Sequence, residues 1–272
     1  MRIARTISDL QLPSDKTIGF VPTMGALHEG HLQLMRRSRE EAEISVISIF
    51  VNPLQFGPTE DFSRYPRDLH ADAAMAESVG VDFVFAPDVS EIYPNQESTV
   101  VAVPEVTTLW EGAHRPGHFD GVSTVVAKLF NIVSPDTAFF GRKDFQQCMV
   151  IRRMVQDLNM RIHLSIEPTV READGLAMSS RNRYLSQEQR AIAPKIFETL
   201  NLIKSEIKAG ELPGKCLDDG NKLLSDLGFL IDYLAYVSDS TLAPLTNPES
   251  ASTLIFAGKI GNTRLIDNVA VA

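Results

Sequence analysis

Cysteine is scarce in this sequence, with only Cys148 and Cys216 among 272 residues. Two cysteines are too few for a disulfide scaffold, and such sparse use suits a reducing compartment. The sequence also lacks any apolar run of the roughly 20 residues that cross a bilayer. Residues 1–6 lead into a polar segment without the apolar centre of a signal peptide. We therefore expect a cytoplasmic protein with no membrane partner.

An excess of basic charge is missing as well. The chain has 26 Lys and Arg against 35 Asp and Glu, a formal net charge of -9. A general nucleic-acid binder usually has a basic balance, so we expect no nucleic-acid partner. A hydrophobic content of 44% and a charged content of 22% are ordinary for a globular protein. The length allows one large domain or two smaller ones.

The first part of the chain alternates between strand and helix patterns. Apolar, β-branched runs predict strands over residues 17–21, 44–51, 81–86, 137–140 and 161–166. Amphipathic patterns predict helices from residue 31 onward and over residues 68–80, 120–133 and 145–158. This alternation is typical of an α/β fold with a Rossmann-like parallel sheet and covering helices.

The pattern changes after about residue 168. Ser186, with Gln189 three residues on, has the spacing of a capping box and predicts one long helix over residues 186–208. A second helix should run to about residue 227, followed by strands over residues 231–237, 252–258 and 263–266. Helices followed by strands indicate a smaller α+β domain. We therefore expect two domains, residues 1–170 and 171–272.

One stretch at residues 22–31 places two histidines and two glycines between a predicted strand and a predicted helix. Glycines let a backbone approach a phosphate, and a helix start offers free N–H groups and a positive dipole end. His28 and His31 could donate to phosphate oxygens or carry protons. They could instead be cap or surface residues. A zinc site with His114 and His118 is another alternative, but neither has a cysteine or an acidic cluster beside it.

Polar side chains follow the second predicted strand directly. If the first two strands are parallel neighbours, Asn52 and Gln55 should open onto the same crevice as His28 and His31. The alternative is a plain turn, because Asn-Pro commonly starts one.

A third polar segment, residues 141–147, also lies between a strand and a helix. Gly141 permits a tight turn, and Lys143 is a mobile charge suited to phosphate. Asp144 can cap the helix, while Gln147 completes a capping-box spacing and could also face the crevice. A charged loop with a good cap would explain Asp144 without any function.

Residues 177–183 lie at the predicted domain junction. Two hydroxyls and two arginines within five residues, Ser179 to Arg183, could grip a polyphosphate. A solvated hinge is the alternative.

Taken together, these stretches resemble a known family. His28-Glu29-Gly30-His31 is similar to the His-x-Gly-His signature of nucleotidyltransferases, and residues 178–181 are similar to their Lys-Met-Ser-Lys-Ser signature. The complete string over residues 22–31 resembles the pantothenate synthetase (pantoate–β-alanine ligase) family. Residues 117–126, 171–176 and 264–268 also look like that family, so the resemblance runs from about residue 17 to the C-terminus. One departure is Arg142, where the family usually has glutamate, which reverses a charge near the expected nucleotide pocket.

The resemblance implies ATP-dependent ligation of pantoate and β-alanine through a pantoyl adenylate, with release of pyrophosphate and AMP. It implies His31, His28 and Lys143 as catalytic residues, with His31 as proton donor, and Mg²⁺ accompanying ATP. Gln55 and Gln147 would hold pantoate, and Gln55 would also contact β-alanine. The second domain would be a lid, and the enzyme a homodimer. The implied ATP contacts are Met24, Gly25, Ala26, Leu27, His28, Glu29, Gly30, His31, Gly141, Arg142, Lys143, Asp144, Val170, Met178, Ser179, Ser180 and Arg181.

Two alternatives belong to other classes of protein. Another nucleotidyltransferase, such as a cytidylyltransferase or a synthetase relative, would use a different nucleotide or acceptor. A catalytically inactive regulator would bind a nucleotide without turnover, although His28, His31 and Lys143 are all present.

Overall fold

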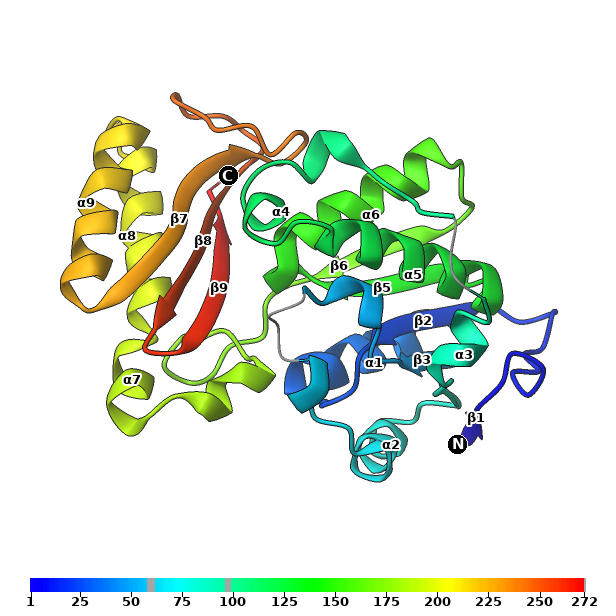
Figure 1. Cartoon of the computed structure of the whole chain (residues 1–272). Helices are drawn as coiled ribbons and strands as arrows, with labels where there is room; N and C mark the ends of the chain where they lie inside the picture. The colour runs from blue at the N-terminus through cyan, green and yellow to red at the C-terminus, as the bar shows by residue number, and fades with distance from the viewer. Residues whose placement is uncertain (58–61, 96–98, 272) are drawn as a thin grey trace.

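The computed structural model describes residues 1–57, 62–95 and 99–271, and its larger part is a six-stranded parallel sheet (Figure 1). The strand order is β1-β4-β3-β2-β5-β6, and every pairing is parallel. The predicted parallel sheet is confirmed, although the three-residue edge strand β1 was missed. The strands are β1 (Arg2–Ala4), β2 (Ile18–Thr23), β3 (Ile44–Ile49), β4 (Phe83–Phe85), β5 (Thr137–Gly141) and β6 (His163–Glu167).

Helices cover both faces of this sheet. One face packs on α1 (Glu29–Glu41) and α2 (Leu69–Ser78), and the other packs on α5 (His118–Val133) and α6 (Phe145–Asp157). Two adjacent residues of β2 point to opposite faces of the sheet: Phe20 joins the core under α5, and Val21 joins the core under α1. Short elements complete this part: η1 (Pro53–Gln55), η2 (Phe62–Arg64), α3 (Val89–Ile92), η3 (Pro104–Val106), α4 (Glu111–His114) and η4 (Arg142–Asp144).

The predicted long helix over residues 186–208 is wrong, because the structure contains two helices there. Helix α7 (Gln187–Ile192) ends before Pro194, and α8 (Lys195–Lys208) begins directly after it. Proline has no N–H to donate inside a helix but is tolerated at a helix start, so the chain restarts at that point. The predicted capping box is confirmed, since Ser186 and Gln189 each accept from the other's backbone N–H, at 3.1 and 3.2 Å.

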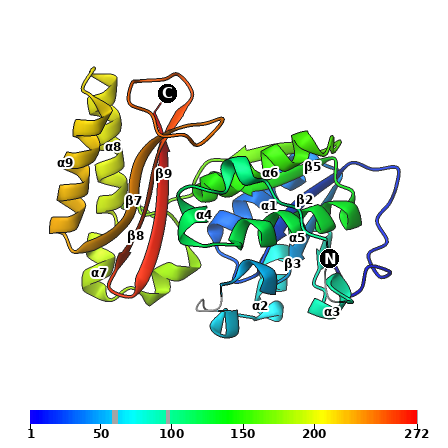
Figure 2. The same ribbon diagram turned by 45° about the horizontal axis from the view of Figure 1, so that its top comes forward.

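The C-terminal part is a three-stranded antiparallel sheet with two helices packed on its outer side (Figures 1 and 2). The predicted α+β arrangement is confirmed, with strands longer than expected. Residues of β7 (Phe229–Ser238) and β8 (Ser252–Ile260), such as Val237 and Ile255, also pack into the core beneath α5 and α6. The remaining elements are η5 (Ser180–Tyr184), α9 (Pro213–Asp226), β7 (Phe229–Ser238), β8 (Ser252–Ile260) and β9 (Thr263–Ala270).

In the described ranges, no helix is long and apolar enough to cross a membrane. Both cysteines, Cys148 and Cys216, are free and buried.

Candidate active site at the carboxyl ends of the strands

The central strand β2 brings the predicted polar segments together. It pairs with β3 on one side and with β5 on the other, and all three strands are parallel. The chain runs from β2 outward through β3 and β4, and then returns to β5 on the opposite side of β2. Such a reversal of strand order opens a crevice at the carboxyl ends, where ligands bind in sheets of this type. The segments that follow β2, β3 and β5 therefore meet at one edge.

His28 and His31 form a reciprocal cap at the start of α1. Nδ1 of His28 accepts from the backbone N–H of Gly30 at 3.1 Å, and Nδ1 of His31 accepts from the backbone N–H of His28 at 3.3 Å. An imidazole nitrogen that accepts a hydrogen bond carries no proton, so each neutral ring carries its proton on Nε2. The cap therefore leaves both Nε2–H groups as donors beside the helix N-terminus.

Both histidine rings are neutral near pH 7. Burial and then the charge of Lys143 lower the pKa of His28 to about 4. Burial, the neighbouring His28 ring and the charge of Lys143 lower the pKa of His31 to about 3. The two ring centroids lie 4.1 Å apart, so protonation of one ring opposes protonation of the other. The charge of Lys143 acts on both rings, which indicates that its ammonium group lies near them.

The loop before α1 has an unusual backbone that a residue outside the predicted set holds in place. Gly25 and Ala26 have φ values of 79° and 51°, a left-handed region that alanine rarely adopts. The buried carboxylate of Asp72 on α2 accepts from the backbone N–H groups of Ala26 at 2.9 Å and Leu27 at 2.8 Å. Asp72 therefore determines the path of the chain from β2 to His28.

Sequence reasoning missed Asp72, although the sequence contains a hint of it. The acidic residue stands among alanines on the buried side of α2, together with Ala73 and Ala76. A carboxylate on the apolar side of a helix normally needs partners. Nothing in the sequence, however, indicates that those partners are backbone groups some 45 residues earlier.

We expect Asp72→Asn to weaken both the fold and the chemistry. The amide keeps one acceptor but turns an NH₂ group toward a backbone N–H. The unfolding free energy should fall by about 1–3 kcal/mol, and any activity that depends on His28 and His31 should slow about tenfold because both rings are displaced. Denaturant unfolding and the rate of that activity measure the two effects. Asp68→Asn is the matched control, since Asp68 caps the same helix at Ala71 N–H and asparagine caps equally well. A wild-type rate in Asp72→Asn would remove this role.

Gln55 lies in the 3₁₀ turn that follows β3, as the sequence predicted for the same edge. Its side-chain carbonyl accepts from Nδ2 of Asn52 at 3.2 Å, and its amide donates to the sulfur of Met24 at 2.8 Å. The same Asn52 amide donates to the carbonyl of Gly121 on α5 at 3.0 Å. Gln55 is buried and its side chain is orientated by Asn52 and Met24, so it is not part of a plain surface turn.

The segment after β5 differs in part from its prediction. Asp144 is the last residue of the 3₁₀ turn η4 and makes no side-chain cap hydrogen bond to α6; its carboxylate lies 3.7 Å from Nζ of Lys143 instead. The predicted capping box of Asp144 and Gln147 is therefore wrong. The tight-turn argument for Gly141 also fails, since its φ is an ordinary -83°. Lys143, Asp144 and Gln147 line a small cavity of about 40 Å³.

Arg142 turns its side chain toward the C-terminal sheet. Its Nη2 donates to Oγ1 of Thr253 at 2.7 Å, and its guanidinium lies over the Phe145 ring at 4.8 Å from the centroid. The Asn268 amide donates to the backbone carbonyls of Arg142 and Lys143, each at 2.9 Å. Arg142 thus fastens η4 to β8 and β9, whereas its neighbour Lys143 lines the cavity.

The segment at residues 170–183 crosses between the two sheets. Val170 accepts from the backbone N–H of Met178 at 2.9 Å, and a Cβ added at Gly30 would lie 3.9 Å from the Val170 side chain. This contact places the segment against the start of α1. Ser179 caps η5 by accepting from the N–H of Arg181 at 3.2 Å, which leaves Ser180 as the first residue of that turn.

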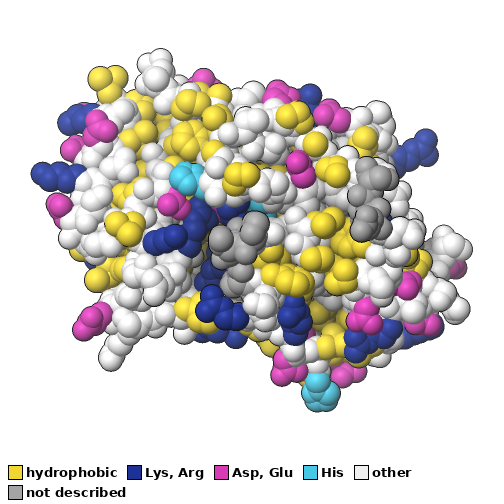
Figure 3. Space-filling view, viewed as in Figure 1, with side chains coloured by type: hydrophobic (Ala, Val, Ile, Leu, Met, Phe, Trp, Pro, Cys, Tyr) yellow, Lys and Arg dark blue, Asp and Glu magenta, His cyan; other side chains and the backbone are white. Residues whose placement is uncertain are grey.

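A cavity of about 720 Å³ lies between the two sheets, and Lys143, Ser179 and Arg181 are on its wall. More basic than acidic side chains line it, and Figure 3 shows Lys and Arg side chains gathered around a hollow in the middle of the molecule. The overall charge is negative, so this basic cavity is a local feature suited to an anionic ligand. Glu29 is not part of it, because its exposed carboxylate pairs with Arg36 on α1.

The alternative of a zinc site has no structural support among the described residues. No group of three or more His, Cys, Asp and Glu side chains there is placed to hold a metal ion. His118 instead contacts the Gln55 carbonyl oxygen at 2.7 Å and Arg115 at 3.0 Å.

Comparison with known proteins identifies the family. A family model described as pantoate-beta-alanine ligase matches residues 2–270, almost the whole chain. The chain belongs to the pantoate–β-alanine ligase family. It is therefore an enzyme, and the reaction class implied by its motifs is confirmed. The chain is 51% identical to pantothenate synthetase from Caldicellulosiruptor saccharolyticus over 260 residues, which covers 94% of this chain and 92% of the relative.

Solved structures of pantoate–β-alanine ligases share this fold. The crystal structure from Thermus thermophilus covers 100% of this chain and 99% of its own, with a TM-score of 0.96 and 49% identity. The structure from Francisella tularensis, complexed with beta-gamma ATP and β-alanine, covers 100% of this chain and 98% of its own, with a TM-score of 0.84 and 34% identity. The predicted fold class, a Rossmann-like sheet with a smaller α+β part, is confirmed.

Proposed function

We propose that this ligase activates pantoate with ATP before β-alanine reacts. A pantoate carboxylate oxygen attacks the α-phosphorus, the bond to the β-phosphate breaks, and pyrophosphate leaves. The amine of β-alanine then attacks the carbonyl of the pantoyl adenylate, and AMP leaves as pantothenate forms. Chemistry of this kind depends mainly on positioning and on stabilising developing charge. The ligand bound in the Francisella tularensis structure, beta-gamma ATP with β-alanine, is consistent with these substrates.

The neutral histidine pair carries this proposal. The Nε2–H groups of His28 and His31 stand at a helix N-terminus, and the charge of Lys143 reaches both rings. Two neutral donors, a helix dipole and a cation form a site for a triphosphate. Ring neutrality also refines the predicted role of His31: it donates a hydrogen bond, and it becomes a proton donor only if bound phosphate charge raises its pKa.

We assign the two amides at the crevice to pantoate. Gln55 is held by Asn52 and Met24, and Gln147 lines the small cavity beside Lys143. Primary amides can both donate to a carboxylate and accept from the hydroxyls of pantoate. Gln55 would also contact β-alanine, since the amine must reach the carbonyl that Gln55 positions.

The proposed ATP contacts follow the three segments around the crevice. Val170 would meet adenine through its backbone, and residues 178–181 would close over the phosphates. The guanidinium of Arg142 is left out, because it donates to Thr253. Mg²⁺ would arrive with ATP, coordinated mainly by phosphate oxygens and water; Asp144 is the exposed carboxylate at the cavity that suits it. The set is Met24, Gly25, Ala26, Leu27, His28, Glu29, Gly30, His31, Gly141, Lys143, Asp144, Val170, Met178, Ser179, Ser180 and Arg181, with Glu29 and Leu27 contributing backbone groups only.

We propose residues 1–170 and 171–272 as two domains, with the second closing as a lid that keeps water from the adenylate. A separate core beneath α8 and α9 supports this division. We further propose a cytoplasmic homodimer, for which the two free, buried cysteines support the reducing compartment.

The decisive experiment mixes enzyme, ATP, Mg²⁺ and pantoate, with and without β-alanine, and follows pyrophosphate and AMP separately. We expect one equivalent of pyrophosphate without β-alanine, and AMP release only after β-alanine is added. Appearance of ADP would mean an acyl phosphate and would contradict the adenylate. Turnover with CTP and none with ATP would favour a different nucleotidyltransferase.

A further inference from the structure

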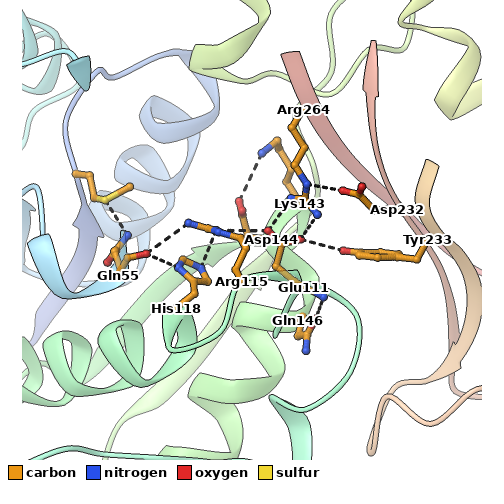
Figure 4. A network of polar contacts seen from close by, with 11 residues as sticks. Gln55, Glu111, Arg115, His118, Lys143, Asp144, Gln146, Asp232, Tyr233 and Arg264 are labelled. Atoms are coloured by element: carbon orange, nitrogen blue, oxygen red, sulfur yellow. Dashed lines mark hydrogen bonds and ion pairs between the residues drawn. The ribbon is translucent and has the colours of Figure 1, made fainter. Parts of the chain in front are cut away.

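The carboxylate of Glu111 connects the C-terminal sheet to the larger part of the molecule (Figure 4). Glu111 is the first residue of the short helix α4 and is only 8% exposed. Both of its carboxylate oxygens accept from Arg264 on β9, with two N–O distances of 2.8 Å. Tyr233 on β7 donates its hydroxyl to the same carboxylate at 3.2 Å. A two-point pair with an arginine fixes the angle between the partners as well as their distance.

The same carboxylate is the first member of a series of hydrogen bonds that ends at the backbone carbonyl of Gln55. Nη1 of Arg115 lies 3.4 Å from Oε1 of Glu111 and 3.0 Å from Nε2 of His118. Arginine only donates, so Nε2 of His118 accepts and the ring proton is on Nδ1. Nδ1 of His118 therefore donates to the backbone carbonyl of Gln55 at 2.7 Å, and Nη2 of Arg115 reaches the same oxygen at 3.4 Å.

The turn that carries Gln55 is also pressed against α5, which leaves it little freedom of its own. A Cβ added at Gly121 would lie 2.2 Å from the carbonyl oxygen of Leu54. Asn52 ties the same turn to the Gly121 carbonyl at 3.0 Å. Displacement of Arg115 and His118 would therefore act on the Gln55 turn as a unit, together with the side-chain amide of Gln55 that Asn52 and Met24 hold.

Other hydrogen bonds fix the position of Glu111, at the start of this series. Its backbone N–H donates to Oε1 of Gln146 at 2.9 Å, and Gln146 is anchored by the carbonyls of Val106 and Leu109 at 2.9 and 3.0 Å. Burial opposes the charge of Glu111, but Arg264 and then Arg115 outweigh it and lower its pKa to about 2. The carboxylate is thus ionised throughout the working pH range of an ordinary enzyme.

We propose that Glu111 is a positioning residue through which the three-stranded sheet holds the Gln55 turn, so that pantoate binding depends on the Glu111–Arg264 ion pair. This inference rests on the proposed role of Gln55 in holding pantoate. Glu111, Arg115, His118 and Gln147 line one small cavity, which places the chain of contacts beside the second proposed pantoate amide. Seating of the C-terminal sheet and pantoate affinity are therefore coupled.

The test compares Michaelis constants for the two substrates of the first half-reaction. Glu111→Gln keeps the shape of the side chain and removes its charge. We expect the KM for pantoate to rise about tenfold and the KM for ATP to change less than twofold. A purely structural role would reduce the amount of folded enzyme, which lowers kcat and leaves both KM values unchanged. An unchanged pantoate KM in folded Glu111→Gln therefore overturns the proposal.

Asp232→Asn is the matched control. Asp232 accepts from Nε of Arg264 at 2.7 Å, yet it lies on β7 within the same sheet as Arg264. Removing it disturbs Arg264 without cutting the connection to α4, so we expect less than a threefold change in pantoate KM. An effect as large as that of Glu111→Gln would assign the coupling to Arg264 orientation alone and would contradict the role of Glu111.

Three further variants make the test conclusive. Arg264→Lys retains the positive charge and loses the two-point geometry, so its pantoate KM should rise at least threefold even if Glu111→Gln does not fold; no change would overturn the proposal. In the double variant with Glu111→Gln and Arg264→Lys, the two effects on pantoate KM should be non-additive, and additive effects would show that the two residues act independently. Gln55→Ala tests the proposed pantoate site separately from the proposed coupling through Glu111. If it leaves pantoate KM unchanged, the proposed pantoate site fails; if it raises that KM while Glu111→Gln does not, only the coupling fails.

Discussion

Replacing His31 with alanine should slow adenylate formation by about a hundredfold or more, the usual loss when a positioned catalytic donor is removed. The ring has two functions that can be separated. Nδ1 accepts from the backbone of His28 at the start of α1, and Nε2–H is the donor proposed to reach the phosphates. Alanine removes both, so the helix should also lose about 1 kcal/mol of capping stability.

His31→Gln distinguishes the two functions. Glutamine is the usual residue at this position of a capping box, so it should keep the hydrogen bond from the His28 N–H and preserve the melting temperature. It does not reproduce the reach of the imidazole Nε2–H. We therefore expect His31→Gln to be nearly as slow as His31→Ala in single-turnover pyrophosphate release, yet as stable as the wild type. A wild-type rate in His31→Gln would reduce His31 to a capping residue.

The pH dependence of the same reaction provides a second measurement. Because the pKa of His31 is about 3 in the free protein, the ring is already neutral well below pH 6.5. Loss of kcat/KM with an apparent pKa near 6.5 should therefore not arise from His31. The lowered pKa of both rings also means that the unfolded chain binds more protons than the folded one between about pH 4 and 6.5, so stability should decrease as the pH falls through that range.

The strand and helix pattern predicted the crevice because each of its three segments follows its own strand directly. The segments after β2, β3 and β5 needed only parallel pairing to meet, and the sheet provides it. Gln146 and Gln147 show where this reasoning stops. They are neighbours in the sequence and both line the small cavity, but Gln146 is buried as a partner of Glu111 while Gln147 is only half-buried, a difference set by the rotation of α6.

Most of the site features that the sequence did not predict depend on contacts between segments far apart in the chain. The roles of Asp72 and Glu111 depend on partners on other elements, which no local pattern in the sequence identifies. Asp144 shows the opposite error, since its local spacing predicted a cap, whereas its side chain makes no cap hydrogen bond at the end of the 3₁₀ turn that contains it. The break at Pro194, by contrast, could have been predicted from the sequence, because proline cannot continue a hydrogen-bonded helix interior.

Lys143→Ala should lower the rate of adenylate formation by about a hundredfold or more, because it removes the cation proposed to neutralise charge at the α-phosphate. The adjacent Arg142 provides a matched control. Both residues lie in η4 and both are cations, but Arg142 donates to Thr253 on β8 while Lys143 lines the cavities. We expect Arg142→Gln to reduce the rate less than threefold. A larger loss in Arg142→Gln than in Lys143→Ala would show that the two roles have been interchanged.

A spectroscopic measurement tests the position of Lys143 without relying on activity. The positive charge of Lys143 contributes to the lowered pKa of both His28 and His31, after burial. Removing that charge should therefore raise both pKa values, whereas Arg142→Gln should leave them in place. Histidine titration by NMR on the free protein reports these shifts directly. If Lys143→Ala is slow but neither histidine pKa rises, the ammonium group does not share a site with the histidine pair, and the rate loss must have another cause.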